Sequence, residues 1–157
     1  MTRPPHILLV EAPYYAHIAA RLRQGAERVL AAAGATYEQI SVPGAYEIPA
    51  AIGLVARASH RFDGFVALGC VIRGETTHYD HICAESARGL QELAVRDGLA
   101  IGFGILTVEN EAQALVRASP EQKDKGGEAV RACLAIVDLK RRLAGEENGH
   151  SRAASRQ

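Results

Sequence analysis

The sequence predicts a three-layer α/β/α sandwich around a four-stranded parallel sheet. Short apolar runs alternate with longer stretches of helical periodicity along most of the chain. Two of the runs, 64–71 and 100–108, are apolar almost throughout, which is typical of parallel strands that helices cover on both faces. A chain of 157 residues provides one such domain and leaves little room for a second.

Two strands and two helices are predicted in the first part of the chain. They are a strand over 6–10, a helix between Pro13 and Gly34, a strand over 37–42 and a helix over 47–59. Gly34 is the residue type that most often ends a helix in the left-handed conformation. Pro43 and Gly44 form a turn dipeptide after the second strand. Pro49 falls in the first turn of the second helix, where its missing amide hydrogen costs little.

Two more strands and three helices complete the predicted fold. They are a strand over 64–71, a helix over 78–97, a strand over 100–108, a short helix over 111–117 and a longer helix over 126–143. Gly98 ends the helix that precedes the fourth strand. The predicted domain covers 1–144, and 145–157, which lack apolar anchors, are predicted to be a disordered tail. This order of elements is flavodoxin-like.

Charge and cysteine content argue against several classes of partner. Lys plus Arg number 18 and Asp plus Glu number 18, so no net charge attracts nucleic acid or an anionic membrane. A net charge near zero also does little to oppose self-association. The three cysteines form no CxxC pair, and no apolar stretch approaches the length of a membrane span. We therefore expect a cytoplasmic protein with reduced thiols that binds neither nucleic acid nor membranes.

The carboxyl ends of the predicted strands are the expected place for a ligand. The richest of these ends is the segment 73–80, which reads Arg-Gly-Glu-Thr-Thr-His-Tyr-Asp. A glycine and two threonines before a helix provide free amides, hydroxyls and the positive end of the helix dipole, which together bind phosphate. The alternative is a threonine that caps the helix without any ligand. No lysine of the Walker type follows, which argues against a nucleoside-triphosphate loop.

His78 begins the helix after these threonines, where an imidazole can exchange protons with a bound substrate. It can equally be a first-turn histidine that only faces solvent. His78 and His81 lack the i,i+4 spacing and the third ligand typical of metal-binding helices, so no metal site is predicted. Cys70, at the end of the third strand, is either a nucleophile or, as its apolar neighbours favour, a small buried side chain.

Three other segments suit a planar, hydroxylated and phosphorylated ligand. Glu47 follows Tyr46 between a glycine turn and a helix start, although a glutamate there can simply complement the helix dipole. Tyr14 and Tyr15 follow the first strand, where an aromatic ring can stack on a planar ligand or belong to the edge of the core. Arg117 ends the short helix, where the dipole favours a cation, and an arginine is also well shaped to clamp phosphate.

Three linked segments point to a known family. They read Val-Pro-Gly-Ala-Tyr-Glu-Ile-Pro at 42–49, Leu-Gly-Cys-Val-Ile-Arg-Gly-Glu-Thr-Thr-His-Tyr-Asp at 68–80 and Gly-Ile-Leu-Thr-Val-Glu-Asn at 104–110. They resemble the motifs of the lumazine synthase family, and the resemblance extends from about residue 6 to residue 143. It implies condensation of 5-amino-6-(D-ribitylamino)uracil with 3,4-dihydroxy-2-butanone 4-phosphate to the lumazine, phosphate and water. That step is the penultimate one of riboflavin biosynthesis and needs no metal or organic cofactor.

The resemblance also implies roles for individual residues. Those expected to bind the pyrimidine and its ribityl chain are Tyr14, Ala45, Tyr46, Glu47, Cys70, Val71, Ile72 and Phe103. Those expected to bind the phosphate are Glu75, Thr76 and Arg117. His78 is expected to transfer protons. Phe103 and Arg117 are expected to come from the neighbouring subunit.

The chain departs from the commonest family residues at three positions. Tyr14 stands where phenylalanine or tryptophan is commoner, and Cys70 replaces a frequent threonine. Glu75 places a carboxylate beside the phosphate site, where its amide can still bind. Two alternatives to the enzyme are a paralogue that binds lumazine or flavin without making it and a flavodoxin-like electron carrier. The complete set of polar site residues favours the enzyme.

The resemblance implies a homopentamer with active sites between neighbouring subunits. Some family members pack twelve such rings into a hollow shell, and these tend to have a glycine-containing turn before the last helix. Here the connection 118–125 contains Pro120 and no glycine, so that bend would be strained. The sequence therefore predicts an isolated pentamer or at most two stacked rings.

Overall fold

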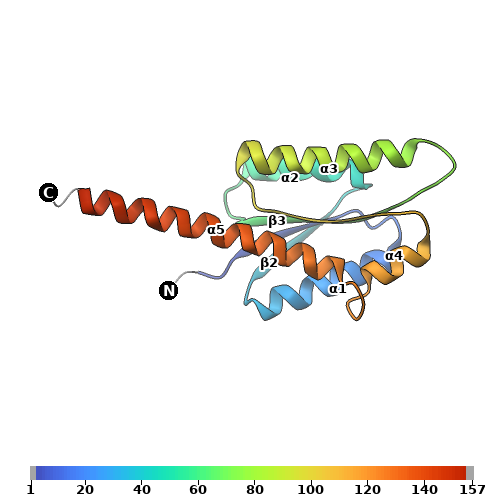
Figure 1. The fold of residues 1–157 in the computed structure, drawn as a ribbon, viewed down its shortest axis with the longest axis horizontal. Helices are drawn as coiled ribbons and strands as arrows, with labels where there is room; N and C mark the ends of the chain where they lie inside the picture. The colour runs from blue at the N-terminus through green and yellow to red at the C-terminus, as the bar shows by residue number, and fades with distance from the viewer. Residues whose placement is uncertain (1–2, 155–157) are drawn as a thin grey trace.

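Four strands form a single sheet in the order β2–β1–β3–β4 (Figure 1). The computed structural model describes residues 3–154, with side chains described as far as residue 145. The strands are β1 (His6–Glu11), β2 (Thr36–Ser41), β3 (Gly64–Ile72) and β4 (Ile101–Val108). Every pair of neighbouring strands is parallel. The predicted four-stranded parallel sheet is confirmed.

Helices cover both faces of the sheet and make the three-layer sandwich that was predicted (Figure 1). One face carries α1 (Ala16–Ala32), α4 (Glu111–Ala118) and α5 (Lys125–Ala154). The other carries the 3₁₀ turn η1 (Ala45–Glu47), α2 (Ile48–Ala58) and α3 (His78–Asp97). Because neighbouring strands are parallel, the chain must return to the starting edge after each strand, and a helix provides that return. No described helix combines the length and apolar character needed to cross a membrane.

Alternate side chains of each strand enter two separate apolar cores. Ile7 and Leu9 of β1 pack against α1 and α5, whereas Leu8 and Val10 pack on the side of α2 and α3. All four are at most 2% exposed. Burying each such side chain stabilises the fold by about 1.5–3 kcal/mol. A strand that is buried on both faces has no polar side, which explains why these strands appear as continuous apolar runs in the sequence.

Glycines let α5 approach α1 closely. A Cβ at Gly126 would collide with the backbone carbonyl of Leu22, and a Cβ at Gly25 or Gly127 would collide with the carboxylate of Asp124. Asp124 has a φ of 46°, the only positive φ of a non-glycine among the described residues. Its carboxylate accepts the Gly127 N–H at 3.2 Å. The bend before α5, for which the sequence offers no glycine, is thus made by an aspartate.

Most predicted boundaries agree with the structure to within two residues. Gly34 and Gly98 have φ values of 67° and 64°, as predicted for residues that end helices. β2 covers residues 36–41 instead of the predicted 37–42, because its pairing with β1 begins at Thr36 opposite His6. The predicted helix over 47–59 begins with the 3₁₀ turn η1 before α2.

The largest difference from the prediction concerns the end of α5. The helix continues to Ala154 and does not end at residue 143. The predicted disordered tail, 145–157, is therefore helical as far as Ala154, and 155–157 lie outside the described residues. Gly145 and Gly149 disfavour a helix in this segment, but alanine, glutamate and arginine are good helix formers, and a helix that is already nucleated gains one hydrogen bond for each further residue. An apolar anchor is not needed for that extension.

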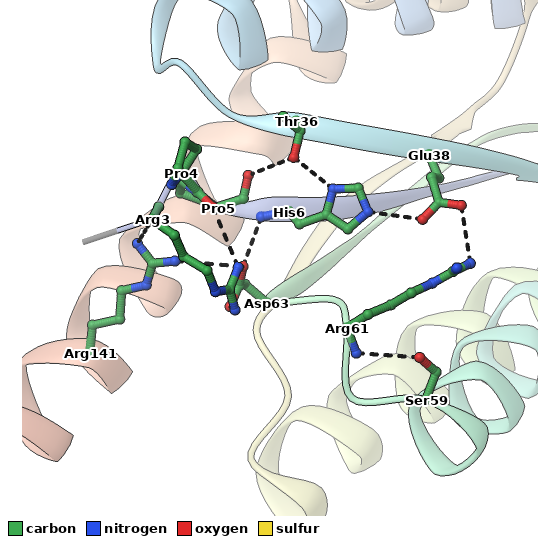
Figure 2. A network of polar contacts seen from close by, with 10 residues as sticks. All are labelled: Arg3, Pro4, Pro5, His6, Thr36, Glu38, Ser59, Arg61, Asp63 and Arg141. Atoms are coloured by element: carbon green, nitrogen blue, oxygen red, sulfur yellow. Dashed lines mark hydrogen bonds and ion pairs between the residues drawn. The ribbon is translucent and has the colours of Figure 1, made fainter. Parts of the chain in front are cut away.

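A network of ion pairs closes the amino end of the sheet (Figure 2). Arg3 donates two hydrogen bonds of 2.7 Å to the carboxylate of Asp63, which also accepts the backbone N–H of His6 at 2.8 Å. Arg141 of α5 lies 3.6 Å from the same carboxylate. The His6 ring lies 2.9 Å from a carboxylate oxygen of Glu38 on β2. We call these five residues the amino-end network.

Candidate functional site

The strand order creates a crevice at the carboxyl end of the sheet. From β1 the chain turns to β2 on one side, and the next strand, β3, pairs with β1 on the other side. Ligands of open α/β sheets bind at such a switch point because the loops after the two strands diverge. A cavity of about 490 Å³ lies there, within the size range of small-molecule sites. Four segments line this carboxyl-end cavity: Tyr14 and Tyr15, residues 43–47, residues 70–72, and His78 with Ile82.

Two tyrosines form the wall that follows β1. The ring of Tyr14 is 77% exposed, so it does not belong to the core. Tyr15 packs against the core cluster on the α1 face and meets Tyr14 edge-on, with ring centroids 4.9 Å apart. Burial raises the pKa of the Tyr15 hydroxyl, with further contributions from Cys70 and Tyr14. Of the two interpretations of this pair, Tyr14 fits a stacking surface and Tyr15 fits the core edge that supports it.

The turn after β2 forms another wall of the cavity. Ala45 is buried, whereas Tyr46 and Glu47 are exposed at the cavity. Glu47 occupies the N-cap of α2 but makes no side-chain cap hydrogen bond there. Its carboxylate lies 3.2 Å from the position that a Cβ on Gly44 would occupy, so the glycine leaves room for it. The carboxylate is therefore available to a ligand as well as to the helix dipole.

The end of β3 forms the base of the cavity through Cys70, Val71 and Ile72. Burial raises the pKa of the Cys70 thiol to about 11. The thiol is therefore protonated near neutral pH, and only a thiolate is a good nucleophile. The structure favours the interpretation of Cys70 as a small buried side chain.

The start of α3 places His78 on the cavity, and its N-cap residue makes no side-chain cap hydrogen bond. Thr77 is the N-cap residue and makes no side-chain cap hydrogen bond, so the alternative of a purely capping Thr77 is not realised. The hydroxyl of Thr76 accepts the His78 N–H at 3.3 Å. Glu75 and Thr76 are exposed and precede His78 closely in the sequence. Neither of them lines the cavity itself. Among the described residues, no group of three His, Cys, Asp or Glu side chains is arranged to hold a metal ion.

Arg73 anchors the loop that leads to α3, and sequence reasoning missed this role. Its Nε donates to Glu109 at 2.8 Å, and its guanidinium lies 3.3 Å from Asp80 and 4.3 Å from the ring centroid of Tyr79. Glu109 directly follows β4, and Asp80 lies in the first turn of α3. An arginine directly after a strand, with acids after the next strand and in the next helix, was the signal in the sequence.

Phe103 and Arg117 lie apart from the carboxyl-end cavity. They line a second cavity of about 530 Å³ between β4 and the start of α5, which we call the outer cavity. Phe103 is 48% exposed, and Arg117 donates to the Gln113 carbonyl at 3.2 Å. Lys125 lines the same cavity and pairs with Glu128 at 2.6 Å, so a second cation accompanies Arg117. Sequence reasoning missed Lys125, which lies eight positions after Arg117 across the turn before α5.

Sequence comparison assigns the chain to a family. The sequence model of the 6,7-dimethyl-8-ribityllumazine synthase family matches residues 4–141. The chain belongs to this family.

Three relatives show how far the similarity to lumazine synthases extends. Identity is 52% over 149 residues with 6,7-dimethyl-8-ribityllumazine synthase 1 of Rhizobium meliloti, covering 92% of this chain and 97% of the relative. Proteins named 6,7-dimethyl-8-ribityllumazine synthase from Novosphingobium aromaticivorans and Zymomonas mobilis share 58% over 135 residues and 54% over 137 residues. These two matches cover 86% and 87% of this chain and 96% and 97% of the relatives. Nearly the whole lengths of the relatives are therefore matched.

The lumazine synthase motifs occupy both cavities of the single chain. Segments 42–49 and 68–80 supply most of the lining of the carboxyl-end cavity. The third motif, 104–110, begins on β4 and lines the outer cavity as far as Thr107. One lumazine synthase chain therefore presents two parts of its motif set on two separate surfaces.

Proposed function

We propose that this protein condenses 5-amino-6-(D-ribitylamino)uracil with 3,4-dihydroxy-2-butanone 4-phosphate to 6,7-dimethyl-8-ribityllumazine, phosphate and water. One observation carries the proposal: in a chain of the lumazine synthase family, motif residues from distant loops meet at one cavity. The reaction forms two C–N bonds, each with loss of water, and expels phosphate between these steps. It needs proton transfer, anion stabilisation and orientation, and no strong nucleophile from the protein.

The pyrimidine occupies the carboxyl-end cavity in this proposal. The exposed ring of Tyr14 stacks on the heterocycle, and the carboxylate of Glu47 accepts hydrogen bonds from ribityl hydroxyls. The backbone and side chains of Ala45 and Tyr46 hold one edge of the ring, and the end of β3 at 70–72 holds the other. Support comes from the observation that residues of all these segments line the same cavity.

The phosphate of the second substrate binds at the start of α3. This helix has 20 residues, and its N-cap residue Thr77 makes no side-chain cap hydrogen bond, so its dipole and the amides other than that of His78 are available to an anion. The amides of Glu75 and Thr76 supply donors, while the exposed Glu75 side chain can point into solvent. The same donors stabilise the phosphate as it leaves.

His78 transfers protons between the substrates. It lines the cavity directly after the phosphate segment, so it can reach a substrate whose phosphate is held there. General acid–base catalysis by such a residue contributes roughly 10²–10⁴-fold to the rate. The remaining acceleration in this proposal comes from orientation of the two substrates.

A ring of five subunits completes the site, with Phe103 and Arg117 of one subunit closing the carboxyl-end cavity of the next. The two cavities lie apart on one chain, which supports a site completed by a neighbouring subunit. Arg117 makes no ion pair with any described residue, so it remains free to clamp phosphate. We propose an isolated pentamer or two stacked rings, to be measured by sedimentation. A shell-sized species would overturn that part of the proposal. The ring works in the cytoplasm, where cysteines stay reduced.

The activity test is to incubate the purified protein with both substrates and follow lumazine fluorescence. Formation of the lumazine is expected, and binding of the lumazine without turnover would identify a non-catalytic paralogue instead.

The shared site has its own test: co-expressed His78→Ala and Arg117→Ala chains should recover part of the activity that each variant lacks alone. Mixed rings contain some sites with both native residues. No recovery would contradict a site shared between subunits.

A further inference from the structure

Glu11 is the only buried carboxylate among the described residues, with 5% of its surface exposed. It is the last residue of β1, on the face that carries α1, and it lies outside the lining of both cavities. Burying a carboxylate is costly unless charged and polar partners compensate it. An apolar residue at this position would continue the pattern of β1 at no such cost. The retained charge therefore needs an explanation beyond burial.

The partners of Glu11 come from two other elements. Arg23 of α1 donates to both carboxylate oxygens, at 3.2 and 3.1 Å. Gln39 and Ser41 of β2 donate to one of these oxygens at 2.7 and 3.3 Å. The backbone carbonyl of Glu11 accepts the N–H of Val42 at 2.9 Å, just past the end of β2. One residue thus joins β1, α1 and β2.

β1 and β2 each lead directly into a wall of the carboxyl-end cavity, and α1 follows the first of these walls. Tyr14 and Tyr15 lie in the sequence between Glu11 and the start of α1. The contact of Glu11 with Arg23 therefore holds together the two elements on either side of these tyrosines. The residues 43–47 follow β2 directly, so the contacts to Gln39 and Ser41 fix the point from which that wall begins. The carboxylate of Glu11 therefore ties the two walls to each other, in addition to the backbone ladder between β1 and β2.

Directional hydrogen bonds define the distance between these elements more sharply than apolar packing does. Apolar contacts tolerate sliding and repacking, whereas a charge-assisted hydrogen bond weakens when its length or angle changes. Aromatic stacking on one wall and hydrogen bonding from the other need a fixed gap between the two.

We propose that Glu11 is a positioning residue for the pyrimidine half of the site: its carboxylate sets the separation between the tyrosine wall and the wall at 43–47. The inference rests on the proposed function. It assigns no contact with substrate to Glu11. The phosphate segment and Arg117 are not bonded to Glu11, so their part of the site does not depend on it.

The experiment compares steady-state kinetics of the assembled protein and of Glu11→Gln. The variant keeps the shape of the side chain but removes the charge that holds Arg23. We expect the KM for the ribitylaminouracil to rise about tenfold and the KM for the butanone phosphate to stay within twofold. Fluorescence titration with 6,7-dimethyl-8-ribityllumazine should show the same loss of affinity. A purely structural role would lower the amount of active protein and leave both KM values unchanged.

Two further variants keep the test decisive. Glu38→Gln is the matched control, because this carboxylate lies on the same sheet, bonded to His6 and Arg61, but at the amino end. It should leave both KM values unchanged. Arg23→Gln removes the partner on α1 and should reproduce the rise in the KM for the pyrimidine, also if Glu11→Gln does not fold.

The outcomes separate this inference from the proposed function. Unchanged or equally raised KM values in both the Glu11 and Arg23 variants would overturn the inference while the unmodified protein still makes lumazine. No lumazine from the unmodified protein would overturn the proposed function itself. A rise in the KM for the pyrimidine alone, absent in the Glu38 control, supports the positioning role.

Discussion

The two ends of the sheet differ in whether their charged side chains are all paired. At the amino end, Arg3 pairs with Asp63, and His6 lies against Glu38, so each charge of the amino-end network has a partner (Figure 2). At the carboxyl end, Glu47 and His78 are exposed on the cavity and make no ion pair with any described residue. The charges of the amino-end network therefore hold the fold together, whereas Glu47 and His78 at the carboxyl end stay available to a ligand.

This difference shows that a charged residue near a site is not by itself a site residue. Arg73 directly follows β3, next to the phosphate segment, yet Glu109 and Asp80 already occupy its guanidinium. Arg117 makes no such pair within the described residues, and its guanidinium donates only to a backbone carbonyl. Pairing, which depends on the folded structure, distinguishes the anchoring arginine from the candidate phosphate ligand.

The largest expected effect is at the carboxyl end. His78→Ala should lower kcat roughly 10²–10⁴-fold, because the imidazole moves protons, while the pyrimidine KM and the melting temperature change little. The matched control is His81→Ala, an exposed histidine one turn further along α3 that lines neither cavity. A loss of pyrimidine affinity as large as the loss in rate would reject the proton-transfer role.

At the amino end, Asp63→Asn should lower the free energy of unfolding by about 2 kcal/mol, because the charged acceptor of Arg3 is lost from a mostly buried site. The kcat of the folded protein should not change, since the network lies at the end of the sheet far from the cavity. Urea denaturation together with activity measurement checks both expectations. Asp138→Asn, at an exposed position on α5, is the control and should have a negligible effect.

Arg117→Ala should raise the KM for the butanone phosphate roughly tenfold and leave the pyrimidine KM nearly unchanged. Arg117→Lys keeps the charge but loses the paired donors, so it should recover part of the affinity. Equal changes in the two KM values would show that Arg117 is structural. Arg117 would then not be an example of a charge that is kept available for a ligand.

The smallest expected effect is a pH dependence of stability that originates at the amino end. Burial alone would raise the pKa of Asp63, but the hydrogen bonds from Arg3 and from the His6 N–H, with the charges of Arg3 and Arg141, outweigh it and lower this pKa. A carboxyl whose pKa is lower in the folded state contributes stability that is complete above its unfolded pKa and is lost as the pH falls through its folded pKa. The difference in free energy of unfolding between the wild type and Asp63→Asn should therefore shrink as the pH falls below 3.8, the ordinary pKa of an aspartate. A difference that stays constant from pH 7 to pH 3 would contradict this origin.

Local sequence signals were sufficient for the order of elements. The helix predicted over 78–97 agrees with α3, because Gly98 can adopt the left-handed conformation that ends a helix. Residues 64–71 are apolar throughout, which predicted a strand buried on both faces. The end of α5 was missed because the helix continues through Gly145 and Gly149, where a helix end was expected. Helix propagation depends on length and nucleation as well as on apolar anchors.

The site was predicted in part. Glycine turns and helix starts after the strands indicated Tyr14, Glu47 and His78 as residues of one strand-end region, and the structure brings all three to one cavity. The roles of Arg73 and Glu11 were not predicted. Each depends on partners more than ten positions away in the sequence, Glu109 for the first and Arg23 and Gln39 for the second.

The sequence by itself determined which segments become strands and helices, where each helix has its start signal, and which family motifs follow the strands. These properties depend on the period of apolar residues and on glycine and proline, which act over a few neighbouring positions. Only the tertiary structure decided which charges are paired, that Cys70 is shielded, and that Phe103 and Arg117 face a different cavity from His78. These properties depend on distances between segments that the chain brings together only when the sheet assembles, and the energy of a charge is set by those distances and by burial.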